Sequence, residues 1–282
     1  MKKVLILGKN GMLGKKMVSF FQKNKNYTLY SYNKESLDIT NFPNVLNVIK
    51  EIKPDILINC TAYTNVDEAE NNRELAFLIN SESVLNLAEI CSKLNIKFVH
   101  FSTDYVFSGK NKDGYLEDSK DLKPLNIYGK SKLKGEEYIK EISEKYDLEY
   151  YIIRTSWLFD DLGKNFVNTI LNLSKTKKEL NIINDQFGSP TYTLDLIDFT
   201  YYLILKNYSS GIYHFSNLGC ISWYDFTKKI CEINNINIQI NPISSDSFKT
   251  LVKRPQYSYL IDTKTDFIHR DWKETLIERF KK

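Results

Sequence analysis

The sequence predicts an α/β protein built on a doubly wound parallel sheet, followed by a smaller C-terminal lobe. Three observations support this fold class. Short apolar runs alternate with helical patterns through the first half of the chain, which is typical of a parallel sheet. A glycine-rich turn joins the first apolar run to the first helical pattern. Beyond residues 155–160 the alternation weakens, and turn-rich segments indicate a second unit.

The first half of the chain contains five segments with the composition of buried parallel strands. Each is short and apolar and leads into a helical pattern or a polar loop, as expected for strands covered on both faces. The predicted strands are residues 4–7, 27–31, 55–60, 97–101 and 150–153. The predicted helices are residues 15–22, 45–52, 67–79, 84–94 and 128–145. Right-handed crossovers should connect the strands, which gives a Rossmann-type sheet.

The second half of the chain shows helical patterns without regular strands between them. These helices are expected at residues 165–173, 194–205, 224–233 and 272–280, with a turn-rich run at 185–190. We therefore predict a dinucleotide-binding domain over residues 1–157. Residues 158–282 are predicted to form a smaller substrate-binding lobe, with some segments returning to the main domain.

Composition and charge exclude several classes of protein. No apolar run approaches the roughly 20 residues of a membrane helix. The N-terminus runs directly into a strand pattern, without the layout of a signal peptide. The four cysteines are scattered, and the net charge of +4 is spread without a dense basic block. We expect a cytoplasmic protein with reduced thiols that binds neither membranes nor nucleic acid, and no metal site.

The turn after the first strand has the spacing of a dinucleotide-binding loop. Gly8, Gly11 and Gly14 lie between a predicted strand and a predicted helix. Glycines let the backbone approach a pyrophosphate, and the start of the helix offers free N–H groups and positive dipole charge. The third strand ends in a small and polar run at residues 59–64, at the sheet edge where such a cofactor lies.

The end of the second strand bears on which nicotinamide cofactor is used. An acidic residue there would bind the ribose hydroxyls of NAD, whereas this sequence reads Ser-Tyr-Asn-Lys over residues 31–34. Lys34 could face a 2′-phosphate, although Glu35 follows it directly. NADPH is therefore favoured and NADH stays open. Asp38 could accept from the adenine amino group or cap a turn.

The segment Tyr128-Gly129-Lys130-Ser131-Lys132 places a phenol and an ammonium four residues apart on a predicted helix. Positions i and i+4 share one helix face, so both side chains can reach one site. A nearby ammonium favours phenolate, and we expect it to lower the pKa of Tyr128. Such a phenol can give a proton to a carbonyl oxygen while a hydride reaches the carbon.

Hydroxyl groups follow the fourth strand at the same predicted sheet edge. Ser102 and Thr103 come directly after the apolar run, and either could donate to a substrate carbonyl that Tyr128 also contacts. Together with Tyr128 and Lys132, they give a hydroxyl, a phenol and an ammonium group in the order that a reductase requires. The predicted catalytic residues are Tyr128, Lys132 and Thr103.

Ten strings along nearly the whole chain resemble the dTDP-4-dehydrorhamnose reductase family of extended short-chain dehydrogenases/reductases. They are GKNGMLG, LDIT, NCTAYTNVDEAE, STDYVFSG, YGKSKLKGE, RTSW, NFV, DQFGSPT, GIYHFSN and RPQYSYL. The resemblance implies NAD(P)H-dependent reduction of the 4-keto group of a nucleotide-linked 6-deoxy sugar. The most specific form of this expectation is the conversion of dTDP-4-dehydro-L-rhamnose to dTDP-L-rhamnose for polysaccharide biosynthesis.

The resemblance also implies roles for individual residues. The pyrophosphate, the adenine end and the middle of the cofactor are expected to meet three short segments, and Lys132 the nicotinamide ribose. The cofactor-binding residues implied are Gly8, Asn10, Gly11, Met12, Leu13, Asp38, Ile39, Ala62, Tyr63, Thr64, Tyr128 and Lys132. The substrate-binding residues implied are Thr103, Asp104, Trp157, Asn165, Gln186 and Arg254. Trp157 could equally be a core residue, and Arg254 a surface arginine.

One departure from the family concerns a metal. Some relatives carry an acidic residue early in the first helix that takes part in a magnesium-linked dimer, whereas this chain has Lys15 and Lys16 there. Cations cannot ligate magnesium, so we expect no such site and leave monomer or homodimer open. Other readings also stay open: a GDP- or UDP-sugar 4-ketoreductase, a reductase giving the C4 epimer, or a non-catalytic NADP-binding subunit.

Overall fold

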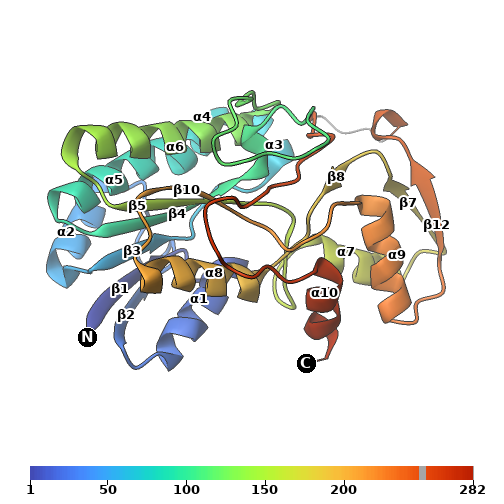
Figure 1. The fold of residues 1–282 in the computed structure, drawn as a ribbon, viewed down its shortest axis with the longest axis horizontal. Helices are drawn as coiled ribbons and strands as arrows, with labels where there is room; N and C mark the ends of the chain where they lie inside the picture. Colours follow the sequence, from blue (N-terminus) through green and yellow to red (C-terminus); the bar gives the residue numbers. More distant parts are fainter. Residues whose placement is uncertain (248–251, 282) are drawn as a thin grey trace.

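The computed structural model describes residues 1–247 and 252–281, and its centre is a six-stranded parallel sheet (Figure 1). The strand order is β10-β5-β4-β3-β1-β2. The strands are β1 Lys2–Leu7, β2 Tyr27–Tyr32, β3 Ile56–Asn59, β4 Lys97–Thr103, β5 Tyr150–Thr155 and β10 Gly211–Phe215. This confirms the predicted doubly wound sheet. The order turns between β1 and β3, where the carboxyl ends of the strands open a crevice for ligands.

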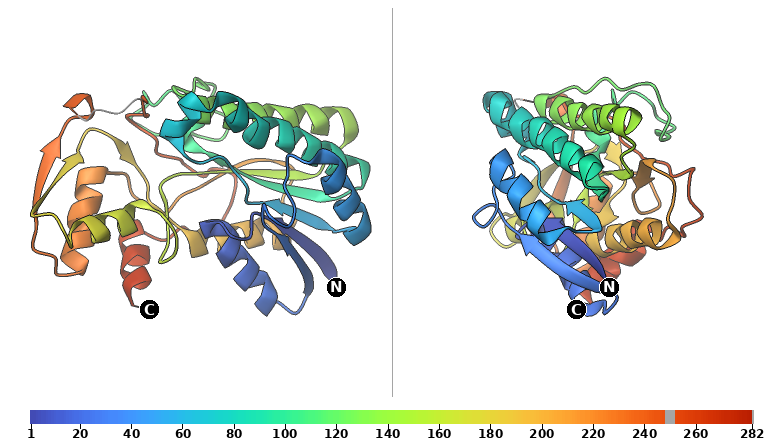
Figure 2. Two further views of the ribbon diagram at one scale, coloured as in Figure 1. Left: turned by 180° about the vertical axis from the view of Figure 1, so that it is seen from behind. Right: turned by 90° about the vertical axis from the view of Figure 1, so that its left-hand side faces the viewer.

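Helices cover both faces of the sheet (Figures 1 and 2). One face carries α2 Phe42–Ile52, α5 Ser83–Lys93 and α6 Ile127–Tyr146 over a core of strand residues such as Leu5, Leu57 and Ile152. The other face carries α1 Met12–Lys23 and α8 Thr193–Lys206 over a core that includes Val4 and Ile58. Neighbouring strand residues thus enter different cores, which explains why these strands read as continuous apolar runs.

The helix that was predicted over residues 67–79 is broken in the structure. It consists of α3 Val66–Asn71, α4 Arg73–Phe77 and a π-helical turn η1 Leu78–Glu82 that leads into α5. The wide turn buries the side chain of Asn80, which accepts a hydrogen bond from Tyr63 N and donates to Tyr63 O. A π-turn has no sequence period of its own, so the apolar pattern could not reveal it.

Apart from α8 and β10, the short elements after residue 157 form a second group beside the sheet (Figure 2). Its helices α7 Phe166–Leu173, α9 Trp223–Ile233 and α10 Trp272–Phe280 match the predicted positions within two residues. Its small sheets pair β7 Glu179–Ile183 with β12 Gln239–Ile243, β8 Phe187–Gly188 with β11 Ile221–Ser222, and β6 Leu158–Phe159 with β9 Thr191–Tyr192. Two 3₁₀ turns are η2 Asp104–Val106 and η3 Ser245–Ser247.

The chain crosses between the two parts more than once. After β9 it returns to the main sheet as α8 and β10, and β10 pairs in parallel with β5 from Gly211↔Tyr151 to Phe215↔Thr155. The division at residues 157 and 158 therefore stays a prediction. Across the residues that the structure describes, no helix combines the length and apolarity needed to cross a membrane.

Candidate active site

A cavity of about 680 Å³ opens at the carboxyl ends of the strands. It is lined by the turn after β1, the ends of β3, β4 and β5, and the first turn of α6. A hollow of about 270 Å³ adjoins it through Tyr105 and Trp223, and one of about 290 Å³ shares Asn10, Gly11 and Ala62 with it. The three share lining residues and are therefore neighbours along one edge of the sheet.

The glycine turn is packed tightly against the end of β3. Gly8 has a φ of +84°, and a Cβ there would lie 2.9 Å from the carbonyl carbon of Cys60. A Cβ on Gly14 would overlap the carbonyl oxygen of Gly8. Gly11 meets no such obstacle and begins α1 without a side-chain cap, so the first N–H groups of the helix stay available for an anion.

We expect Gly14→Ala to weaken the binding of NADPH by at least tenfold. The methyl group would push Gly8 away from the start of α1 and distort the turn that approaches the pyrophosphate, and overpacking of this kind costs about 1–3 kcal/mol of stability. Fluorescence titration with NADPH and urea unfolding measure the two effects. Gly211→Ala is the matched control, because its Cβ would meet nothing closer than 3.9 Å. Equal NADPH affinity in both variants would contradict the role of the turn.

The hollow of about 290 Å³ beyond the glycine turn is lined by residues predicted to lie near the adenosine end of the cofactor. Gly8, Lys34, Asp38 and Ile39 all line it. Asp38 Oδ1 accepts hydrogen bonds from Thr40 N at 2.9 Å and Thr40 Oγ1 at 2.8 Å, so the residue caps a turn. Burial raises the pKa of Asp38, but the bonds from Thr40 and the charge of Lys34 outweigh it and lower the pKa overall. Asp38 therefore faces the hollow as an anion.

Tyr128, Lys132 and Thr103 line the same cavity, as does Gly11 from the glycine turn. Asn126 caps α6 by accepting a hydrogen bond from Gly129 N at 2.8 Å, which fixes the first turn that carries Tyr128. A Cβ on Gly129 would overlap the carbonyl oxygen of Tyr105. The helix can therefore sit directly against the loop after β4, which brings the phenol next to Thr103.

The expected effect of Lys132 on Tyr128 is wrong for the cofactor-free protein. Burial raises the pKa of Tyr128 to about 12, while its hydrogen bond with Thr103 lowers it and the charge of Asp104 raises it. The Lys132 ammonium does not point at the phenol. Its Nζ lies 2.6 Å from Phe101 O and 3.2 Å from His100 Nε2, both on β4. Burial lowers the pKa of Lys132 to about 8, against the influence of Glu136.

The Thr103 hydroxyl connects the phenol to a buried carboxyl group. Thr103 Oγ1 donates to Asp104 Oδ1 at 2.9 Å and accepts from Tyr105 N at 3.2 Å. Asp104 is 2% exposed, and burial raises its pKa to about 7. Its second oxygen, Oδ2, is buried and has no partner at full hydrogen-bond geometry, although the nearby Ser258 hydroxyl lowers the pKa of the carboxyl. A polar group left this way in a ligand cavity is suited to a polar substrate.

Comparison with known proteins places this site in a family. The family model described as RmlD substrate binding domain matches residues 1–282. The dTDP-4-dehydrorhamnose reductase of Aggregatibacter actinomycetemcomitans is 38% identical over 276 residues, covering 94% of this chain and 92% of that protein. The chain belongs to the dTDP-4-dehydrorhamnose reductase family.

Two further relatives of this family align over almost their entire length. The spore coat polysaccharide biosynthesis protein SpsK of Bacillus subtilis is 37% identical, covering 99% of this chain and 96% of that protein. The crystal structure of dTDP-4-dehydrorhamnose reductase from Bacillus anthracis in complex with NADP is 40% identical, with a TM-score of 0.93 and 99% of each chain covered.

The substrate is expected to extend beyond Tyr105. Only some of the residues predicted to bind it line the main cavity or the adjoining hollow there. Trp157 lines the main cavity with a φ of +45° and stacks on Trp223, with ring centroids 3.3 Å apart. Gln186 and Arg254 line the adjoining hollow. A left-handed backbone at a bulky residue is uncommon. The indole lines the cavity and also packs against the core that contains Phe226. The role of Trp157 stays a prediction.

Three of the predicted site residues make contacts within the protein, through an ion pair, hydrogen bonds or ring packing: Arg254, Asn165 and Tyr63. Arg254 Nη2 pairs with Asp67 Oδ2 at 2.8 Å, which joins the C-terminal part of the chain to α3. Asn165 caps α7, and its amide donates to Asp160 O and Leu162 O, so it shapes the loop beside Met12. Tyr63 packs its ring near α4 and α6, while its neighbours Ala62 and Thr64 line the cavity.

Sequence reasoning missed several residues of the cavity. Trp223 comes from the distant helix α9, and nothing in its local sequence connects it to the RTSW string. Tyr105 lies within the STDYVF string and lines both the main cavity and the adjoining hollow, so its position one residue after Asp104 was a usable signal. His100 lies behind Lys132, where only the packing of β3 against β4 brings it next to Asn59, a residue of the predicted run 59–64.

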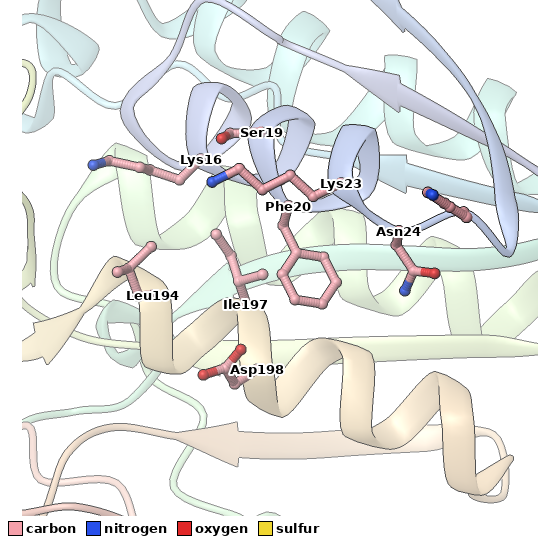
Figure 3. Close-up of a pocket in the computed structure, with 9 residues that line it drawn as sticks. Lys16, Ser19, Phe20, Lys23, Asn24, Leu194, Ile197 and Asp198 are labelled. Carbon is pink, nitrogen blue, oxygen red and sulfur yellow. The ribbon is translucent and has the colours of Figure 1, made fainter.

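The first helix carries the cations Lys15 and Lys16 near its start. Lys16 Nζ pairs with Asp160 at 3.1 Å and Asp161 at 2.6 Å, which ties α1 to the loop before α7. A separate hollow between α1 and α8 is edged by Lys16, Lys23 and Phe20 (Figure 3). Among the described residues, no cluster of three His, Cys, Asp or Glu side chains is arranged to hold a metal ion. The expected lack of a magnesium site stays a prediction.

Proposed function

We propose that the protein uses NADPH to reduce the 4-keto group of a nucleotide-linked 6-deoxy sugar, converting dTDP-4-dehydro-L-rhamnose to dTDP-L-rhamnose. The observation that supports this best is the meeting of Tyr128, Thr103 and the glycine turn in one cavity. Full-length similarity to reductases of this name gives the substrate, and a related structure in complex with NADP gives the cofactor.

The residues present fit a dinucleotide. The uncapped start of α1 and the open side of Gly11 suit a pyrophosphate, and the hollow with Lys34, Asp38 and Ile39 suits a phosphorylated adenosine. When bound, the cofactor would supply the hydride that reaches C4 of the sugar. Tyr128 is positioned to give its phenolic proton to the carbonyl oxygen, so that ketone, hydride and proton together yield the alcohol.

Burial keeps Tyr128 in the protonated form that reduction requires. With a pKa of about 12 the phenol keeps its proton at neutral pH and is ready to act as an acid. Thr103 Oγ1 lies between Asp104 and Tyr128 and has one hydroxyl proton, so it holds the carbonyl oxygen beside the phenol by turning that proton from Asp104 to the substrate. The buried carboxyl of Asp104 then meets the sugar through Oδ2.

The nucleotide end of the substrate is assigned to the hollow beyond Tyr105. Arg254 lines this hollow with Gln186, and a planar guanidinium can bind diphosphate oxygens through two parallel N–H groups. Its pairing with Asp67, which is 48% exposed, can give way to a diphosphate at little cost, because exposed ion pairs contribute about 0–1 kcal/mol. The proposed substrate residues are therefore Thr103, Asp104, Trp157, Gln186 and Arg254, with Asn165 shaping the loop.

The test is a turnover assay with a panel of substrates. The protein is mixed with NADPH and dTDP-, GDP- or UDP-linked 4-keto-6-deoxy sugars, and the loss of reduced nicotinamide is followed by absorbance. We expect NADPH to be oxidised with the dTDP sugar and not with the GDP or UDP sugars. NMR of the product should show the rhamno configuration at C4. Saturable NADPH binding without oxidation would instead indicate a non-catalytic subunit. A cytoplasmic location and the choice between monomer and homodimer stay predictions.

A further inference from the structure

Asn126 at the start of α6 is 2% exposed, and its side chain binds two separate parts of the chain. Its Oδ1 accepts from Gly129 N at 2.8 Å, which caps the helix that carries Tyr128. Its Nδ2 donates to the carbonyl oxygen of Lys253 at 3.0 Å, across 127 positions of the chain. A backbone N–H only donates and a carbonyl oxygen only accepts, so both contacts require the same orientation of the amide.

The Lys253 carbonyl belongs to the peptide that precedes Arg254, the residue proposed to bind the diphosphate of the substrate. Arg254 lines the hollow beyond Tyr105, and its Nη2 pairs with Asp67 Oδ2 at 2.8 Å. The bond from Asn126 therefore fixes the backbone from which the guanidinium extends. It does so at the main chain, whereas the ion pair acts on the side chain.

The ion pair of Arg254 leads back to the same helix start. Asp67 and Glu70 lie about one turn apart on α3, and Glu70 Oε1 accepts from Ile127 N at 2.8 Å. This N–H is one of those that an α-helix leaves without an internal partner in its first turn. The start of α6 is thus bound twice, at Asn126 and at Ile127, and the ion pair of Arg254 joins the two segments that bind it.

The segment that carries Arg254 is held at its other end as well. A Cβ on Gly109 would come 2.5 Å from Pro255 Cα, so the two backbones are in direct contact. Tyr257 N donates to Gly109 O at 2.9 Å. Loss of the Asn126 bond should therefore shift Arg254 without detaching the segment from the loop after β4.

We propose that Asn126 is a positioning residue that couples Arg254 to the start of α6 and so holds the diphosphate and the phenol of Tyr128 at a fixed separation. When Arg254 leaves Asp67 for the diphosphate, the bond from Asn126 to the main chain persists. Asn126 itself lines neither the main cavity nor the adjoining hollow. The inference rests on the proposed function, since it takes the diphosphate to lie at Arg254.

Asn126→Ser and Asn126→Thr separate the two bonds of the amide. Serine and threonine are good helix caps, so the bond from Gly129 N should remain, but nothing replaces the NH₂ group that faces Lys253 O. We expect dTDP to bind both variants about fivefold more weakly in isothermal titration calorimetry, the equivalent of one lost hydrogen bond. Thymidine, which has no diphosphate, and NADPH should bind them with wild-type affinity.

A double-mutant cycle with Arg254→Gln tests whether the effect passes through Arg254. Arg254→Gln alone should weaken dTDP binding by about tenfold or more, because it removes charged hydrogen bonds. Adding Asn126→Ser to it should weaken dTDP binding no further, since the guanidinium that Asn126 positions is already absent. A fivefold loss in that background, or an equal loss for thymidine, would show a merely structural role and overturn the proposal.

The same titrations distinguish failure of the inference from failure of the proposed function. If Arg254→Gln weakens dTDP binding and both Asn126 variants bind it as the wild type does, the inference alone is wrong. If Arg254→Gln leaves dTDP affinity unchanged, the diphosphate lies elsewhere, and the substrate placement fails together with the inference.

Asn41→Ser is the matched control, because Asn41 is exposed and caps α2 by the same kind of bond, from Asn44 N at 3.3 Å. It should leave dTDP affinity unchanged. Should neither Asn126 variant fold, hydrogen exchange of the wild-type protein decides. There dTDP should slow the exchange of Gly129 N–H more than thymidine does, and equal exchange with the two ligands would overturn the proposal.

Discussion

Tyr128→Phe is expected to lower kcat by on the order of 10²–10⁴ while NADPH still binds with nearly wild-type affinity. The substitution removes the proton donor and leaves the ring that packs against Tyr105, with centroids 5.8 Å apart. Cofactor affinity should persist because the glycine turn and the adenosine hollow are untouched. Steady-state NADPH oxidation with the keto sugar and fluorescence titration with NADPH measure the two effects separately.

Tyr138→Phe is the matched control, because Tyr138 lies on the same helix and its hydroxyl contacts Glu82 at 3.4 Å, away from the cavity. This variant should keep wild-type turnover. If Tyr128→Phe retained more than about a tenth of the wild-type activity, the assignment of the proton donor would be wrong.

Arg154→Met should destabilise the protein by about 3–5 kcal/mol, because it leaves the carboxylate of Glu136 buried without its counterion. The pair is almost completely buried, with Nε–Oε1 at 2.9 Å and Nη2–Oε2 at 2.6 Å. Ser102 Oγ donates to the same carboxylate, and Ser102 precedes Thr103. The loss of stability is read from the free energy of unfolding in urea, and kcat should also fall as the end of β4 shifts.

The double variant Glu136→Leu/Arg154→Met distinguishes the effect of losing one charged partner from the effect of losing the whole ion pair. Replacing both charges by apolar groups should recover most of the stability, since a buried ion pair and a well-packed apolar pair are often close in free energy. A cost below about 1 kcal/mol for Arg154→Met alone would mean that Glu136 finds another partner or a proton.

The sheet and the glycine turn could be predicted because their signals are local. The apolar runs of β1, β3 and β4 and the helix that carries Tyr128 and Lys132 each occupy twenty consecutive residues or fewer. β10 was not predicted as a strand, because the run GIYHF is as short as many loop segments and pairs with β5 only after the chain returns from the lobe. Such long-range pairing has no periodic signature.

Within the site, the meeting of Tyr128, Thr103 and the glycine turn could be predicted, whereas the direction of the Lys132 side chain could not. The i, i+4 spacing places Lys132 on the correct helix face. The direction of its amine depends on Phe101 O and His100, which reach it only through the packing of β4 against α6. The stacking of Trp157 on Trp223 likewise depends on two segments that are 66 positions apart in the chain.

The position of β10 at the border of the sheet limits how the chain can be cut. Without residues 211–215, β5 would expose a row of free N–H and C=O groups along its outer side. Unpaired strand borders of this kind attract other chains and promote aggregation. A fragment that ends near residue 157 would therefore be expected to precipitate on expression, even though it contains the whole glycine turn and both Tyr128 and Lys132.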